Sequence, residues 1–258
     1  MIIDGRLDEG RARQVATLAS RLGLAGVWLR LPWWPLAAAP GGTGSDLLAV
    51  LGSSAGIRPG LVLDADAAGA DAGWLGSVPA GLRIALTGSP TAVAWWQELI
   101  GRRPDLGVSQ LALPPGRGAE PLAVFVPCAP GRDLAAEVSA AAAAAAGRPV
   151  LAEVTVSVGR TAAEASARAD ADALFTLAGH PAQQGLFGTL EECQAAAARL
   201  GHAGATELIC YLPLASDLPD VLAQVRSIAV GAGVLRPGEP PSPAPPPPAD
   251  WGGRRTTA

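Results

Sequence analysis

Residues 148–230 constrain the fold more than any other part of the chain, because strand and helix patterns alternate there with short connections. Residues 149–158, Pro-Val-Leu-Ala-Glu-Val-Thr-Val-Ser-Val, are rich in β-branched side chains and are typical of a strand. A second strand is expected at 206–212, and a last amphipathic helix at 217–229. Two helix starts between the strands have the spacing of a capping box: Thr161 with Glu164, and Thr189 with Glu192. This order predicts a parallel sheet covered by helices.

The N-terminal half adds enough strands to close such a sheet into a barrel. Six further strands are predicted, near residue 2 and at 27–31, 61–63, 82–86, 108–113 and 122–126. Eight strands with right-handed helical crossovers predict an α/β fold, a compressed (β/α)8 TIM-type barrel with a short first strand and one missing helix. Closure requires the 206–212 strand to pair with both the 149–158 strand and the strand near residue 2. An open doubly wound sheet is the alternative, if the strand near residue 2 does not pair.

Two serines mark helix starts in the N-terminal half. Ser45 is expected to cap a helix over residues 45–54, since its side chain can accept a hydrogen bond from a free N–H group of the first turn. Ser89 is followed by Pro90, which is favoured at the first helical position because an N–H group is not needed there. A helix is therefore predicted from Pro90 onward.

The length fits one barrel and a tail. The chain has 258 residues with 49% apolar content, and an α/β barrel typically needs about 250 residues. We expect residues 1–235 to form a single barrel domain. Proline and glycine dominate residues 236–258, where Pro245 to Pro248 are consecutive, so this tail is expected to be disordered or polyproline-like.

Charge and cysteine content exclude several classes of partner. The net charge is −4 and the 19 basic residues are scattered, so no nucleic acid is expected to bind. The longest apolar stretch, 140–146, is too short to span a membrane, and charged residues interrupt any N-terminal signal pattern. The cysteines, Cys128, Cys193 and Cys210, have no metal-ligand spacing and are interpreted as buried thiols in a reducing compartment. We expect a cytoplasmic protein without a metal site.

Three segments carry a resemblance to a known family. They are Gly188-Thr-Leu-Glu-Glu192, Ala203-Gly-Ala-Thr-Glu-Leu-Ile209 with the helix that follows at 217–229, and the strand-and-helix unit at 156–169. Together they resemble the C-terminal end of the bacterial luciferase-like monooxygenases. The resemblance implies an α/β barrel and an oxidoreductase that uses reduced flavin mononucleotide (FMN) or a deazaflavin (coenzyme F-420) on a small organic substrate, whose identity it does not give.

The same resemblance directs attention to cofactor-binding residues at the C-terminal ends of the strands, where α/β barrels carry their active sites. Arg160, Gly188 and Thr189 are the candidates for holding the cofactor's phosphate near a helix N-terminus. His180 lies on a loop that could present it to the ring, although an ordinary exposed histidine is the alternative. Trp33 could line an apolar slot for the ring, or it could seal the top of the barrel. No catalytic residue is identified.

Two aspartates and one departure from the family bear on whether the chain is an enzyme. Asp64 and Asp66 could form a carboxylate pair for metal binding or proton transfer, or Asp66 could simply cap the segment after it. The luciferase-like enzymes place an acidic residue and a histidine at the end of the second strand, where this chain has Leu29-Arg30-Leu31-Pro32. The alternative function is therefore a non-catalytic, degenerate barrel that serves as a partner subunit or a binding module. Association with itself or with another chain is left open.

Overall fold

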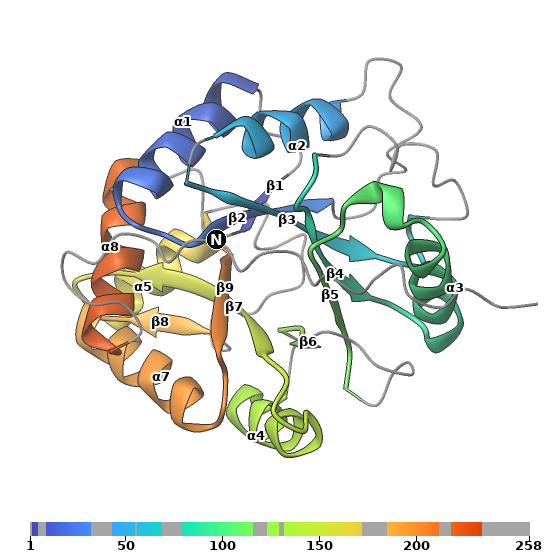
Figure 1. Ribbon diagram of the computed structural model, residues 1–258. Coiled ribbons are helices and arrows are strands. Elements are labelled where there is room, and N and C mark those ends of the chain that lie inside the picture. Colours follow the sequence, from blue (N-terminus) through green and yellow to red (C-terminus); the bar gives the residue numbers. More distant parts are fainter. Residues whose placement is uncertain are drawn as a thin grey trace, which may run out of the picture.

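Nine parallel strands and the helices around them make up the described structure (Figure 1). A computed structural model describes residues 2–4, 9–31, 43–54, 56–68, 79–115, 123–128, 132–171, 185–211 and 218–233. The strands are β1 (Ile2–Asp4), β2 (Gly26–Leu31), β3 (Arg58–Asp64), β4 (Arg83–Thr87), β5 (Gln110–Leu113), β6 (Ala123–Val126), β7 (Val150–Val158), β8 (Leu186–Gly188) and β9 (Glu207–Tyr211).

Eight of these strands form a closed ring. Strands β1 to β7 follow one another in order, β9 pairs with β7, and β9 also pairs with β1. The contact that closes the ring is short, with Ile2 opposite Tyr211. The barrel is therefore confirmed, the predicted pairing of the 206–212 strand with both of its neighbours is confirmed, and the open doubly wound sheet is wrong.

Strand β8 was not predicted. Among the described residues it pairs only with the C-terminal end of β7, where Val156 lies opposite Leu186 and Val158 opposite Gly188. It has three residues, so it offers too little alternation for a pattern to be recognised. It pairs with the residues of β7 that follow those paired with β6 and β9, so it lengthens the wall of the barrel at the C-terminal end of β7.

Seven α-helices lie around the outside of the ring in the described residues (Figure 1). They are α1 (Glu9–Arg21), α2 (Thr43–Ser53), α3 (Pro90–Gly101), α4 (Leu134–Ala144), α5 (Ala162–Asp170), α7 (Leu190–His202) and α8 (Leu218–Gly231), with a short 3-10 turn, η3 (Pro104–Leu106). Ser89 caps α3 as predicted, accepting a hydrogen bond from the Ala92 N–H at 3.4 Å. The predicted start of α2 is wrong, because the helix begins at Thr43 and Ser45 lies inside it.

The sequence predicts that a helix is missing in the connection between β5 and β6. It spans residues 114–122, and its described part, residues 114–115, is not helical. Residues 116–122 lie outside the described residues, so the missing helix stays a prediction that rests on the nine-residue length of the connection.

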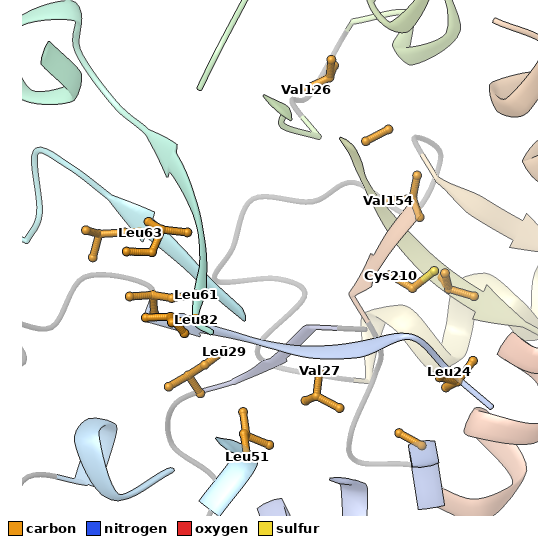
Figure 2. Close-up of a cluster of buried hydrophobic side chains, with 14 of the residues drawn as sticks. Leu24, Val27, Leu29, Leu51, Leu61, Leu63, Leu82, Val126, Val154 and Cys210 are labelled. Atoms are coloured by element: carbon orange, nitrogen blue, oxygen red, sulfur yellow. The ribbon is translucent and has the colours of Figure 1, made fainter. Parts of the chain in front are cut away.

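Two apolar clusters hold the strands in place. The outer one lies between the strands and the helices, and Figure 2 shows Val27 and Leu29 of β2 beside Leu51 of α2. The inner cluster fills the barrel with side chains of alternate residues, among them Trp28, Phe125 and Ile209. Each fully buried side chain of this size contributes roughly 1.5–3 kcal/mol to the free energy of folding.

The N-terminal end of the barrel is closed by a charged pair. Arg83 of β4 donates from Nη1 to both carboxylate oxygens of Glu207 on β9, each at 2.8 Å. The guanidinium carbon of Arg83 lies 4.4 Å from the centre of the Trp28 ring, a cation–π contact. The pair fills this end of the barrel beside Trp28, whereas α/β barrels bind their ligands at the opposite, C-terminal end. Among the described residues no helix is long and apolar enough to cross a membrane.

Candidate functional site

The C-terminal ends of the parallel strands meet at one face and bring polar side chains together inside the barrel mouth. Arg30 is the penultimate residue of β2, Asp64 ends β3, and Tyr211 ends β9. Cys128 follows the end of β6 by two residues, and Glu153 lies in the first half of β7. These five residues come from five different strands, and we call them the mouth cluster.

An ion pair spans the mouth cluster. Arg30 donates from Nη1 to Oε1 of Glu153, and the other carboxylate oxygen accepts the Cys128 N–H at 3.3 Å. The Glu153 side chain is fully buried, whereas the Arg30 side chain is 22% exposed. The pair therefore presents its cation to the mouth and holds its anion within the wall.

The surroundings shift the pKa of two residues of the mouth cluster, Arg30 and Cys128. Burial lowers the pKa of Arg30, and the nearby Tyr211, Asp64 and Cys128 oppose that shift. Burial raises the pKa of the Cys128 thiol, which the neighbouring Thr155 and the charge of Arg30 only partly offset. At neutral pH the arginine is charged and the thiol is protonated, so Cys128 is not an activated nucleophile.

The two aspartates after β3 have separate structural tasks. Asp64 Oδ1 accepts the N–H groups of Asp66 and Ala67, at 3.0 and 3.2 Å, and so caps the turn that follows β3. Asp66 accepts the Ser89 N–H at 2.6 Å and the Ser89 hydroxyl, which lowers its pKa. The prediction that Asp66 caps the segment after it is wrong, since Asp64 has that place and Asp66 binds the N-cap of α3. Within the described ranges, no three His, Cys, Asp or Glu side chains are grouped to hold a metal ion.

A second polar corner lies at the rim, where β7 and β8 end. Val158 and Gly188 are paired, and the Gly159 N–H donates to the Gly188 carbonyl at 2.9 Å. Arg160 directly follows Gly159, and Thr189 directly follows Gly188. The structure therefore brings Arg160, Gly188 and Thr189 to one place. Gly188 has a φ of +125°, and a side chain there would meet the Glu192 carboxylate at 2.2 Å.

Both helices that begin at this rim corner have the predicted threonine cap, but the reciprocal capping box is complete only at α7. Thr189 accepts the Glu192 N–H at 3.3 Å, and Glu192 accepts the Thr189 N–H at 2.8 Å, a complete capping box. At α5, Thr161 accepts the Glu164 N–H at 3.2 Å, while the Glu164 carboxylate accepts the N–H of Arg160 at 3.0 Å. Each helix has four N–H groups in its first turn without a partner inside the helix, and these caps leave some of them available.

The rim corner fits a phosphate in one respect and resists it in another. The Arg160 side chain is 91% exposed and lies 3.1 Å from Glu164, so its guanidinium can turn toward a ligand. Two helix N-termini, those of α5 and α7, add favourable partial charge. The negative charges of the Glu164 and Glu192 carboxylates weaken the attraction of this corner for a phosphate. On balance the residues fit, because the cation and the available N–H groups remain after both caps are made.

Two predicted cofactor residues, Trp33 and His180, lie outside the described residues. Sequence reasoning missed Glu153 and did not single out its partner Arg30. A signal was present, because Glu153 is the only charged residue in the β7 sequence and Arg30 the only one in the β2 sequence. A charge inside an otherwise apolar strand that faces a barrel interior needs a partner across the barrel.

Comparisons with known proteins show the fold. No family model matches the chain, and no curated protein matches it. A coenzyme F-420-dependent tetrahydromethanopterin reductase from Methanopyrus kandleri aligns with a TM-score of 0.62 at 10% identity, over 88% of this chain and 96% of that one. Riboflavin lyase (RcaE), solved with modified FMN and riboflavin, aligns at 0.60 and 13% identity, over 91% and 87%. The monooxygenase RslO1 from Streptomyces bottropensis aligns at 0.53 and 13% identity, over 88% and 92%.

Proposed function

We propose that this protein is a luciferase-like oxidoreductase, of the monooxygenase type, that binds reduced FMN or a deazaflavin (coenzyme F-420) at the C-terminal face of the barrel and acts on a small organic substrate. The observation that carries the proposal is the rim corner, where Arg160 lies beside the N-termini of α5 and α7. Solved structures of the same fold support it. One is named with modified FMN, one is named as dependent on coenzyme F-420, and one is named as a monooxygenase.

In this proposal the phosphate is held at the rim corner. Arg160 supplies a charge-assisted hydrogen bond, and N–H groups of the first turn of α7 after Thr189 supply further donors. Gly188 allows the chain to bend tightly in front of this turn, since its φ of +125° is unfavourable for any other residue. The flavin or deazaflavin supplies the redox chemistry when bound, and the protein orients it and excludes water.

The ring would lie inward from the rim corner, over the mouth cluster. Trp33 and His180 are proposed to pack against it or donate to it, as their positions after β2 and in the 172–184 connection suggest. The proposed setting is the cytoplasm, where Cys128, Cys193 and Cys210, all buried and none in a disulfide within the described residues, stay as thiols.

Titration of the purified protein with FMN and with coenzyme F-420 tests the proposal directly. We expect one of them to bind with a micromolar dissociation constant, as measured by the change in its fluorescence. Arg160→Ala should weaken that binding by roughly 1–3 kcal/mol, about 5- to 150-fold, the range for losing a charge-assisted hydrogen bond. The matched control is Arg102→Ala at the C-cap of α3, an exposed arginine that is likewise paired with a glutamate four residues away.

The second candidate function is a non-catalytic barrel that acts as a partner subunit or binding module. The carboxylates of Glu164 and Glu192 favour it, since both lie at the helix starts that a phosphate would use. This function takes the place of the first if neither FMN nor coenzyme F-420, oxidised or reduced, binds to the unmodified protein.

A further inference from the structure

The mouth cluster contains an ion pair, Arg30 with Glu153, that is expected to add little to the free energy of folding. Taking Arg30 and Glu153 out of water costs several kcal/mol per ion, and an apolar pair of similar size would often be at least as stable. The rest of the inner cluster is apolar, with Trp28, Phe125 and Ile209 filling the same interior. The position of the pair, at the C-terminal end of the barrel where α/β barrels bind their ligands, suggests a use in binding.

The two partners of the pair are not equivalent. Both oxygens of Glu153 accept hydrogen bonds, one from Arg30 and one from the Cys128 N–H, and the side chain has no exposed surface. Arg30 keeps 22% of its side chain exposed, and its planar guanidinium has five N–H donors. Among the described residues, the side-chain hydrogen bonds of Arg30 involve Nη1 alone. The glutamate therefore fixes the arginine, and the arginine has donors left for a ligand.

We propose that Arg30, positioned by Glu153, donates hydrogen bonds to the carbonyl-bearing end of the flavin or deazaflavin ring and so favours the reduced form of that ring over the oxidised one. This inference rests on the proposed function and adds the residue that tunes the cofactor. Ligands of this class suit the site, because their ring is planar and apolar on its faces and carries carbonyl oxygens at one edge. A charge near such an edge is one of the ways in which a protein tunes a bound cofactor.

Glu153 has an opposing effect on the same equilibrium. Reduction of the ring by two electrons with uptake of one proton adds one negative charge, which Arg30 attracts and which the carboxylate of Glu153 repels. Removing the cation should therefore make the reduced form less favoured, whereas removing the anion should make it more favoured. A purely structural pair would not behave in this way, since breaking it from either side would disturb the mouth in the same direction.

The test compares the affinity for oxidised and reduced FMN, and for oxidised and reduced coenzyme F-420, by anaerobic titration of the full chain. In Arg30→Met we expect the preference for the reduced form to fall about tenfold, equivalent to a midpoint potential about 30 mV more negative for a two-electron couple. In Glu153→Gln we expect about a tenfold rise, with the potential moving about 30 mV the other way. Arg30→Lys keeps the charge and should retain most of the wild-type preference.

The matched control is the exposed Arg102–Glu98 pair at the C-terminal end of α3, whose variants Arg102→Met and Glu98→Gln should leave the preference within twofold. If Arg30→Met does not fold, Glu153→Gln and Arg30→Lys still decide the sign. Equal shifts in the same direction from Arg30→Met and Glu153→Gln, or no shift in either, would overturn the inference while cofactor binding and the proposed function stand. Absence of any binding to the wild-type protein would remove both.

Discussion

The two ends of the barrel each contain a buried arginine–glutamate pair, and the pairs are arranged in opposite senses. At the N-terminal end the Arg83 side chain is 3% exposed and Glu207 is 27% exposed; at the mouth Arg30 is 22% exposed and Glu153 fully buried. At the N-terminal end the arginine is sealed against Trp28, so no ligand can reach it. At the mouth the arginine is the accessible partner. The comparison separates a pair that closes the barrel from a pair that can serve a ligand.

The first prediction concerns the closed end, where the largest loss of stability is expected. Glu207→Gln leaves the charge of Arg83 in an almost fully buried place without its counter-ion. Breaking a buried pair from one side costs about 3–5 kcal/mol of the free energy of unfolding. Urea denaturation at pH 7 measures it.

The control for this prediction replaces both partners. Arg83→Met with Glu207→Leu removes both charges and should recover most of the lost stability, because a well-packed apolar pair is often as stable as the ion pair. Cofactor affinity should be unchanged in the double variant, since the mouth lies at the other end. A double variant as unstable as Glu207→Gln would show that the charges themselves hold the barrel closed.

The second prediction uses pH on the same pair. Burial raises the pKa of Glu207, but the charge and hydrogen bonds of Arg83 outweigh this and hold it below its ordinary value. A lowered folded-state pKa means that the stabilisation is present above the unfolded pKa of about 4.3, and is lost as the pH falls through the folded value. The stability gap between wild type and Glu207→Gln should therefore shrink between pH 7 and pH 3, as followed by denaturation at each pH. A constant gap would contradict the assignment.

The eight strands of the ring and the three threonine and serine caps were predictable, because each depends on residues close together in the chain. The closure of the ring, which brings Ile2 opposite Tyr211, is not local and was predicted from the number of strands and the handedness of their crossovers. Thr161, Thr189 and Ser89 hydrogen-bond as their spacing predicted. Strand β8 was not predictable, since it is short and pairs only with an extension of β7 that the ring does not need.

The candidate site was predictable only in part. Arg160, Gly188 and Thr189 come together because a strand pairing joins their neighbours, and their use by a cofactor stays a prediction. Glu153 has its partner, Arg30, 123 residues away across the barrel. No local pattern specifies such a pair, because it depends on the curvature and register of the closed sheet.

The third prediction compares the mouth with the closed end. Glu153→Gln should cost about 1–3 kcal/mol of the free energy of unfolding, the range for a hydrogen bond to a charged group. The cost is expected to be smaller than for Glu207→Gln, because Arg30 is partly open to water and can be solvated when its partner is gone. Urea denaturation of the two variants under one set of conditions ranks them. An equal or larger loss for Glu153→Gln would mean that the mouth pair is as structural as the closed end.

The last prediction supplies the lower end of this scale, a third arginine–glutamate pair that is exposed on both sides. Glu98 lies on α3, and Arg102, four residues later, is the residue that follows the helix as its C-cap. Water screens their attraction and both long side chains lose freedom when they pair, so helix pairs of this kind contribute only about 0.3–0.5 kcal/mol. Glu98→Gln should therefore change the free energy of unfolding by less than about 0.5 kcal/mol, and 0.5 M salt should remove the difference. The three glutamine variants then rank by how far the remaining arginine is hidden from water: Glu207, then Glu153, then Glu98. A large effect of Glu98→Gln would break that ranking, because it would show that the arginine's exposure does not set the cost of losing its partner.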